Sequence, residues 1–392
     1  MTSAIKPGRR RAYAAALAAA TLVMAGCSTE GSSGGTSRES TSKEQANADA
    51  AQKKLDALYE GATYQAPPTD GPAAQRGKKV FMVNAGVQAP TGSAVAEAAQ
   101  DAAKVLGWDL TVFDGKFQPN LYQEGVRQAI ASGADVIWNF AIDCPVARTA
   151  FEEAEKAGIP VVSQEAADCS DADPSAPSLF TENLHYAQGS FLDWARALGA
   201  AQADWVIART GGQAKVIEIA VPDLIITKAL HEGFVAEMKT CDTCEVVQTV
   251  QSSAAVLGPE LQTKVEQTLL RNPDANAMAF SYDDLMTGGG AAAIRGSGRS
   301  EQLEVIAGTG FPANNELIRK DQGQDAGFGI DYVYETWSAA DLVNRFLAGE
   351  EGVPSGVGVQ VYDRDNGLPQ KTYTAPIEGF QEQYTKIWQA GS

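Results

Sequence analysis

Several polar side chains directly follow short apolar runs of the sequence, at positions where a strand would end. A carboxylate there accepts two hydrogen bonds from neighbouring hydroxyl groups, and a threonine hydroxyl both donates and accepts. The sequence offers no nucleophile–histidine arrangement and no metal-ligand signature beside them. The pattern therefore favours a site that binds a small polar solute, with no metal and no cofactor. The positions are Glu165, Asp283, Thr309 and Asp331.

These positions depend on a regular alternation of apolar runs and amphipathic segments from residue 79 onward. The segments 94–106, 122–131 and 146–157 have helical periodicity. Strands that alternate with helices form βαβ units, which build parallel sheets covered by helices on both faces. The predicted strands are 80–83, 110–113, 136–140, 160–163, 216–221, 245–250, 277–280, 304–307, 327–330 and 359–362.

About ten strands are too many for one compact open sheet, so the alternation predicts two doubly wound α/β lobes. The break is expected near 180–183, where a short extended segment precedes a long helix. Ligands of doubly wound sheets bind beyond the carboxyl ends of the strands. This rule makes the polar residues at the strand ends the candidate site.

The N-terminus has the pattern of an export signal. A basic segment with Arg9, Arg10 and Arg11 precedes an apolar run over 12–24, and the sequence 22–27 resembles a bacterial lipobox that ends at Cys27. This predicts a signal peptide over 1–27 and a lipid anchor on Cys27, the alternative being an ordinary signal peptide. Residues 28–78 are expected to form a flexible tether with a helix near 45–60, because their polar composition buries little apolar surface.

The net charge of −18 makes binding to a phosphate backbone unfavourable. Four cysteines remain after export, and an even number in an oxidising compartment favours disulfides. Three pairings are open, and we favour Cys144–Cys169 with Cys241–Cys244, because the first pair lies on loops after neighbouring predicted strands. Free thiols are the alternative.

Several segments carry, in order, a resemblance to a known family. They are 133–137 with 142–143, the run 155–162, the segment 280–284 and a closing helix at 380–388. From residue 80 onward the chain resembles the sugar-binding type I periplasmic binding proteins, the ribose- and galactose-binding group. The resemblance implies two lobes joined by a hinge of three crossovers, an N-terminal lobe (79–182 and 332–358) and a C-terminal lobe (183–331 and 359–392).

The resemblance also assigns positions in the ligand site. Glu165 and Ala166 stand where the family has an Asp-Arg pair, so a carboxylate is kept and a guanidinium is lost. Lys228 stands at a family arginine, and Thr309 at a common aspartate. Asp283 replaces a ligand-binding asparagine, and a group that only accepts hydrogen bonds suits a solute richer in donors, such as an amine.

Other candidates follow from the first lobe and the last crossover. Gln88 and Thr91 lie on the turn after the first strand, where sugar binders often place aromatic side chains. Phe140 is expected to replace that stacking surface, whereas Trp138, on the same side of the strand, is as easily a core residue. Asp331 is expected to contact the ligand or to brace the hinge.

The prediction is a monomeric, non-enzymatic solute-binding lipoprotein of an ABC importer, which captures a sugar or sugar-like solute. Its expected partners are the permease and ATPase subunits, and its expected location is the outer side of the cell membrane. Two alternatives stay open. One is an extracellular carbohydrate hydrolase that uses paired carboxylates, and the other is a receptor that signals to a membrane partner.

Overall fold

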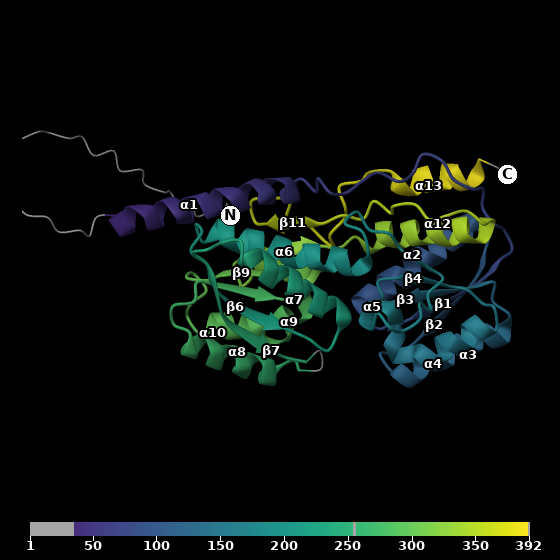
Figure 1. The fold of residues 1–392 in the computed structure, drawn as a ribbon, viewed down its shortest axis with the longest axis horizontal. Coiled ribbons are helices and arrows are strands. Elements are labelled where there is room, and N and C mark those ends of the chain that lie inside the picture. The colour runs from purple at the N-terminus through teal and green to yellow at the C-terminus, as the bar shows by residue number, and fades with distance from the viewer. Residues whose placement is uncertain (1–34, 254–255, 391–392) are drawn as a thin grey trace, which may run out of the picture.

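The computed structural model describes residues 35–253 and 256–390, which form two α/β lobes side by side (Figure 1). The predicted signal peptide and the anchor residue Cys27 lie outside the described residues. Within the described ranges, no helix combines the length and the apolar character needed to span a bilayer.

The N-terminal lobe is built on a five-stranded parallel sheet in the order β2-β1-β3-β4-β5. Helices α3 (Pro119–Ser132) and α4 (Cys144–Lys156) pack together on one face, and α2 (Pro90–Leu106) and α12 (Tyr332–Ala348) pack on the other. Both faces are covered, so the strands are buried on both sides. The strands are β1 (Lys79–Asn84), β2 (Asp109–Asp114), β3 (Val136–Phe140), β4 (Val161–Gln164) and β5 (Glu182–Asn183).

The C-terminal lobe has a six-stranded sheet in the order β11-β10-β9-β8-β6-β7. Helices α6 (Phe191–Arg209) and α7 (Ile225–Met238) lie on one face, while α8 (Pro259–Arg271), the π-helical turn η1 (Met286–Gly290) and α10 (Ala291–Gly296) lie on the other. Two short helices, α9 (Asp283–Leu285) and α11 (Pro312–Lys320), follow β8 and β9. The strands are β6 (Lys215–Ala220), β7 (Glu245–Gln251), β8 (Ala277–Phe280), β9 (Glu304–Thr309), β10 (Ala326–Gly329) and β11 (Gln360–Asp363).

The predicted fold class of two doubly wound lobes is confirmed, and each of the ten predicted strands overlaps a strand of the structure. One strand departs from the parallel pattern, because β11 runs antiparallel to β10. The chain leaves β10 toward the other lobe and returns after α12. The chain therefore re-enters the sheet at the end where β10 finishes. For this reason β11 runs in the direction opposite to β10.

The N-terminal segment differs from the expected flexible tether. Helix α1 (Gly35–Tyr59) lies along α6 of the C-terminal lobe (Figure 1). Ala48, Ala51 and Leu55 are buried in this contact. The sparse but regularly spaced apolar residues of the helix are thus enough to hold it against the lobe. The expectation of a flexible tether over 28–78 is therefore wrong for residues 41–78. We call residues 41–78 the N-terminal strap.

The second half of the N-terminal strap passes from the C-terminal lobe to the N-terminal lobe. The Thr63 hydroxyl and the backbone of Val359 exchange hydrogen bonds, and the Gln65 N–H donates to Gly356 O at 3.0 Å. Further on, the Gln75 N–H donates to Asn344 Oδ1 of α12 at 2.9 Å. The strap therefore has fixed partners on both sides of the lobe junction.

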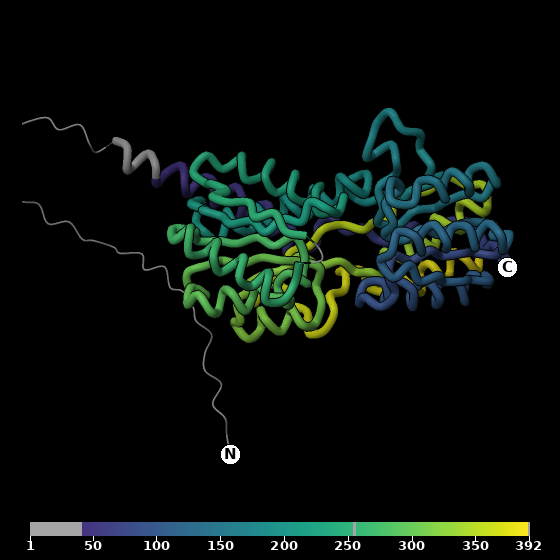
Figure 2. The backbone as a smooth tube through the Cα atoms, turned by 90° about the horizontal axis from the view of Figure 1, so that it is seen from below, coloured from purple at the N-terminus to yellow at the C-terminus, as the bar shows by residue number. Residues whose placement is uncertain are grey.

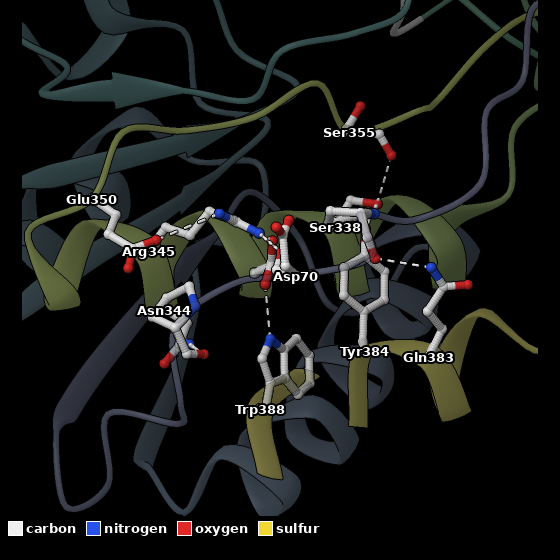
Figure 3. Close-up of polar contacts among 12 residues, drawn as sticks. Asp70, Ser338, Asn344, Arg345, Glu350, Ser355, Gln383, Tyr384 and Trp388 are labelled. Atoms are coloured by element: carbon white, nitrogen blue, oxygen red, sulfur yellow. Dashed lines mark hydrogen bonds and ion pairs between the residues drawn. The ribbon is translucent and has the colours of Figure 1, made fainter. Parts of the chain in front are cut away.

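The C-terminal helix α13 (Phe380–Gln389) also departs from its expected place. Trp388 Nε1 donates to Asp341 of α12 at 2.8 Å, and the Tyr384 hydroxyl donates to Ser338 at 3.0 Å. Figure 3 shows both aromatic side chains of α13 pointing toward α12. Helix α13 therefore packs on the N-terminal lobe. The expected assignment of 359–392 to the C-terminal lobe holds for β11 but is wrong for α13.

Five passages join the two lobes within the described residues. Three of them are the expected crossovers, from β5 to α6, from β10 to α12 and from α12 to β11. The strap and the segment between β11 and α13 add two more. Figure 2 shows the chain running between the two lobes at several levels.

Two disulfides form, and both have the predicted pairing. Cys144–Cys169 joins the first residues of α4 and α5 (Cys169–Ala172), with Cα atoms 4.9 Å apart. Cys241–Cys244 closes the turn between α7 and β7. The first bridge fixes the two loops that leave β3 and β4 at the lobe junction.

Candidate functional site

The lobes meet at the carboxyl ends of their strands. Asp143, on the loop after β3, accepts a hydrogen bond from the backbone N–H of Ala167 in its own lobe at 2.9 Å, and its pKa also responds to hydrogen bonding by the Ile225 N–H at the start of α7 in the other lobe. Burial raises the pKa of Asp143 to about 6, although these hydrogen bonds oppose the rise. The contact describes a closed arrangement of the lobes.

Tyr332, the first residue of α12, lies at the centre of this junction. Its ring stacks against Phe311 of the C-terminal lobe, with centroids 6.1 Å apart and planes 12° from parallel. Burial raises the pKa of its hydroxyl, and the charges of Glu165, Glu335 and Asp283 raise it further, while a hydrogen bond with Thr91 lowers it. Three of the predicted site residues therefore surround this one ring.

Thr91 reaches that position because the loop after β1 is tightly folded. Asn84 holds the loop, since its Oδ1 accepts from the Gly86 N–H at 2.9 Å and its Nδ2 donates to Gly92 O at 3.0 Å. A Cβ on Gly92 would lie 2.0 Å from Gly86 O, so only glycine allows α2 to begin here. Gln88 lies on the same turn and is exposed.

Glu165 follows β4 in a left-handed backbone conformation with φ of 52°. This conformation is strained for a glutamate, and it is the kind of backbone feature that clusters at binding sites. Its Oε1 is buried without a hydrogen-bond partner among the described residues. Burial raises the pKa of Glu165 well above its usual range, and the neighbouring Glu335 carboxyl raises it further.

Glu335 lies on the first turn of α12 and is fully buried. The Tyr186 hydroxyl, from the crossover between the lobes, donates to Glu335 Oε1 at 2.5 Å, and Glu335 Oε2 has no partner in the described chain. Burial raises the pKa of Glu335 to about 7. Because Glu165 and Glu335 lie close together, ionisation of one carboxyl disfavours ionisation of the other.

Asp283 occupies the corresponding place in the C-terminal lobe. Its Oδ2 accepts from the backbone N–H of Gly310 at 2.9 Å and of Phe311 at 3.0 Å, and from the Thr309 hydroxyl at 3.3 Å. Its Oδ1 has no partner among the described residues. Burial raises the pKa of Asp283 to about 7. One oxygen thus positions the loop that carries Phe311, and the other stays available to a ligand.

Asp331 is fully engaged by backbone groups. Its Oδ1 accepts from the N–H groups of Val333 and Tyr334, which caps the start of α12, and its Oδ2 accepts from the Ala375 N–H at 2.8 Å. These contacts tie the crossover from β10 to α12 to the segment that leads to α13. The geometry fits a brace of the hinge.

Two other candidates lie apart from the buried carboxyls. Phe140 is buried in the same core cluster as Trp138, so its ring is covered by the lobe. Lys228 is exposed on the first turns of α7, close in sequence to the Ile225 contact. Neither side chain has a contact with Glu165, Glu335 or Asp283 among the described interactions.

A cavity of about 580 Å³ lies beside this cluster. Ala166 and Asp171 line it from the N-terminal lobe, and the crossover from Asn183 to Phe191 lines it from the side of the hinge. Tyr186 belongs both to the wall of the cavity and, through its hydroxyl, to the carboxyl cluster. The volume is within the range of small-molecule sites.

Sequence reasoning missed Glu335, Tyr332, Tyr186 and Phe311. The signal for Glu335 was an acid among the aromatic and small residues at the start of a helix, one turn after Asp331. A buried acid at such a position needs a partner or a function. No comparable pattern marked Tyr186, because it lies in an irregular crossover.

A two-lobed α/β protein with buried polar groups at the lobe junction belongs to the class of proteins that close around a solute. Residues 80–351 match a family model described as a periplasmic binding protein domain. The chain therefore belongs to the periplasmic binding protein family, as its resemblance predicted, and it is a binding protein, not an enzyme.

Solved structures share the fold at low sequence identity. The glucose-galactose binding protein GanP from Geobacillus stearothermophilus has a TM-score of 0.64 at 17% identity, covering 74% of this chain and 99% of its own. An ABC transporter solute-binding protein from Actinobacillus succinogenes with bound D-allose has a TM-score of 0.62 at 17% identity, covering 74% and 98%. The arabinose-binding component from Shewanella sp. ANA-3, bound to L-arabinofuranose, has 0.60 at 17% identity, covering 80% and 97%. A comparison with curated protein sequences finds no match.

Proposed function

We propose that this protein is the solute-binding component of an ABC importer and that it captures a sugar or sugar-like solute between its lobes. The observation that carries the proposal is a set of buried carboxyl oxygens that receive no hydrogen bond from an N–H or hydroxyl group of the described chain, namely Glu165 Oε1, Glu335 Oε2 and Asp283 Oδ1. Hydroxyl groups of a solute satisfy such acceptors. The family match and the sugars named for the similar structures support the same class of ligand.

Lobe closure supplies the link to transport. The contact between Asp143 and the start of α7 exists only when the lobes are together. A ligand that bridges Glu165 and Asp283 stabilises that arrangement, because it binds the closed state better than the open one. A permease that recognises the closed state then receives only loaded protein.

The test is a thermal-shift screen of the chain from residue 28 onward against sugars, polyols, amines and nucleosides, followed by calorimetry on each hit. A specific ligand raises the melting temperature and binds with one site per monomer. Glu165→Ala is expected to weaken binding of that ligand about tenfold or more, because it removes a charged hydrogen bond. A hit whose affinity is the same in wild type and in this variant contradicts the proposed site.

We further propose that export ends with lipidation of Cys27, so that the protein stays attached to the outer face of the cell membrane. The lipobox-like sequence 22–27 supports this. Replacement of Cys27 by serine is expected to release the folded protein into the medium, as followed by fractionation of expressing cells. Retention of the variant in the membrane fraction argues against the anchor.

A further inference from the structure

The three buried acids at the lobe junction have no positively charged partner among residues 35–253 and 256–390. Within the described chain, no Lys, Arg or His forms a hydrogen bond or ion pair with Glu165, Glu335 or Asp283. The partners of these three groups are backbone N–H groups, hydroxyls and one another. The exposed Lys228 is not among them.

Some buried or half-buried acids elsewhere in the described chain are instead paired with a basic side chain. Asp341 forms an ion pair with Arg345 at 2.7 Å, and Glu218 lies 2.7 Å from His231. A buried carboxylate without a cation is unfavourable unless it is protonated or receives a cation from elsewhere. For Glu165, Glu335 and Asp283, neither an arginine nor a lysine fills this role among the interactions of the described residues.

The groups that face the acids confirm their negative surroundings. Asp331 on α12 and Asp284 on α9 add negative charge, and the hydroxyls of Tyr186 and Tyr332 add neutral donors. Next to Glu165 the side chain is the buried methyl of Ala166. The site therefore has unused acceptors and a deficit of positive charge.

We propose that the solute carries a protonated amine beside its hydroxyl groups, as an amino sugar or amino polyol does, and that Glu165 and Glu335 hold the ammonium group. This inference rests on the proposed function and specifies its ligand class. In the empty protein the Glu165–Glu335 pair holds at least one proton. An arriving ammonium favours the doubly ionised pair, so binding expels that proton to solvent.

The experiment compares matched pairs of probes by calorimetry on the chain from residue 28 onward. The pairs are glucose with glucosamine, galactose with galactosamine and mannose with mannosamine. At least one amino member is expected to bind tenfold or more tightly than its neutral counterpart. The binding enthalpy of this amino sugar is measured in two buffers of different ionisation enthalpy, and the difference between them is expected to show that a proton is released. The affinity for the same sugar is expected to rise from pH 5.5 to pH 7.0.

Two variants separate the ammonium contact from general damage. Glu335→Gln keeps the shape and an acceptor for Tyr186, and it is expected to abolish both the preference for the amino probe and the proton release. Glu351→Gln removes one charge from an exposed acid of the crossover and is expected to change neither. The melting temperature of each variant reports whether the fold is retained.

Neutral sugars that bind as tightly as their amino counterparts overturn the amine inference and leave the proposed function standing. An amino preference that survives in Glu335→Gln also overturns it. Absence of binding by every member of both series counts against the proposed function itself.

Discussion

Asp143 of the N-terminal lobe lies close enough to the backbone N–H of Ile225, the residue at which helix α7 of the C-terminal lobe begins, for that N–H to oppose the rise of its pKa. The same carboxyl group accepts from the Ala167 N–H at 2.9 Å, so it is oriented by its own lobe before it reaches the other. A carboxylate at a helix N-terminus is favoured by the helix dipole and by free N–H groups. The pair therefore acts as a contact that forms only on closure.

Removal of this contact is expected to favour the open arrangement. Asp143→Ala is predicted to weaken solute binding about three- to tenfold, because closure loses one charge-assisted hydrogen bond. Small-angle scattering with ligand present is expected to show a larger radius of gyration than for the wild type. Asp143→Asn keeps an acceptor oxygen and serves as the control. Its binding affinity and its radius of gyration should lie between those of the wild type and of Asp143→Ala. Equal scattering curves for all three proteins would show that the contact does not hold the lobes together.

Asp283 links ligand binding to the loop that carries Phe311. Asp283→Ala is predicted to weaken binding about tenfold or more, since it removes the free Oδ1 and also releases the N–H groups of Gly310 and Phe311. Calorimetry on the ligand found in the screen measures the change. The exposed Asp274, on the turn before β8 at the opposite end of that strand, provides a control, and Asp274→Ala is expected to bind within about twofold of wild type. A large loss of affinity in the control variant alone would show that the ligand binds elsewhere than at Asp283.

The stability of the protein is predicted to decrease between about pH 5 and pH 7. Each of five buried acids has a pKa of about 6 or 7 in the folded protein, above its value of about 4 in an unfolded chain. The folded state therefore binds protons more tightly. Its advantage is full at low pH and is lost as pH rises through these values. The acids are Asp143, Asp204, Asp283, Asp325 and Glu335.

Urea unfolding at pH 5.5 and pH 7.5 measures this effect. The free energy of unfolding is expected to be at least about 1 kcal/mol higher at the lower pH, because one pKa unit on a single group corresponds to about 1.4 kcal/mol. Glu335→Gln should reduce the difference, since it removes one of the five groups. A protein that is more stable at pH 7.5 would contradict the raised pKa values of these five acids.

The contact between the N-terminal strap and the C-terminal lobe is predicted to contribute to global stability. Leu55 is fully buried against that lobe, and Leu55→Ala is expected to lower the free energy of unfolding by about 2–4 kcal/mol. The exposed Lys53 of the same helix supplies the control, and Lys53→Ala should change it by less than about 0.5 kcal/mol. Identical unfolding curves for the leucine variant and the wild type would mean that α1 is detached in solution.

The sequence predicted the regular part of the fold well, because each strand is a short apolar run between amphipathic helices. It was less informative about the two chain ends. Leu55 and Trp388 dock α1 and α13 onto lobes that are far away in sequence, and local periodicity carries no information on such contacts. Composition alone made the segment that contains Leu55 resemble a tether.

The candidate site was predicted only in part, because some of its residues follow regular strands and others come from contacts that local sequence does not show. Glu165, Asp283 and Thr309 follow strands directly, as the rule for doubly wound sheets requires, and the resemblance to the sugar-binding family singled them out. Glu335 and Tyr186 come from a helix and an irregular crossover, and their proximity to Glu165 depends on how the lobes are joined. Whether the predicted residues contact a ligand stays a prediction for the variants described above.

Because of the two additional passages between the lobes, each lobe contains a helix from the far end of the described chain. Helix α1, at the start of the described chain, packs on the C-terminal lobe, and helix α13, near its end, packs on the N-terminal lobe. A gene fragment that encodes either lobe alone would thus lack a covering helix and leave an apolar face open to water. Each lobe relies on residues from the opposite end of the chain, and autonomous half-molecules are not expected to fold.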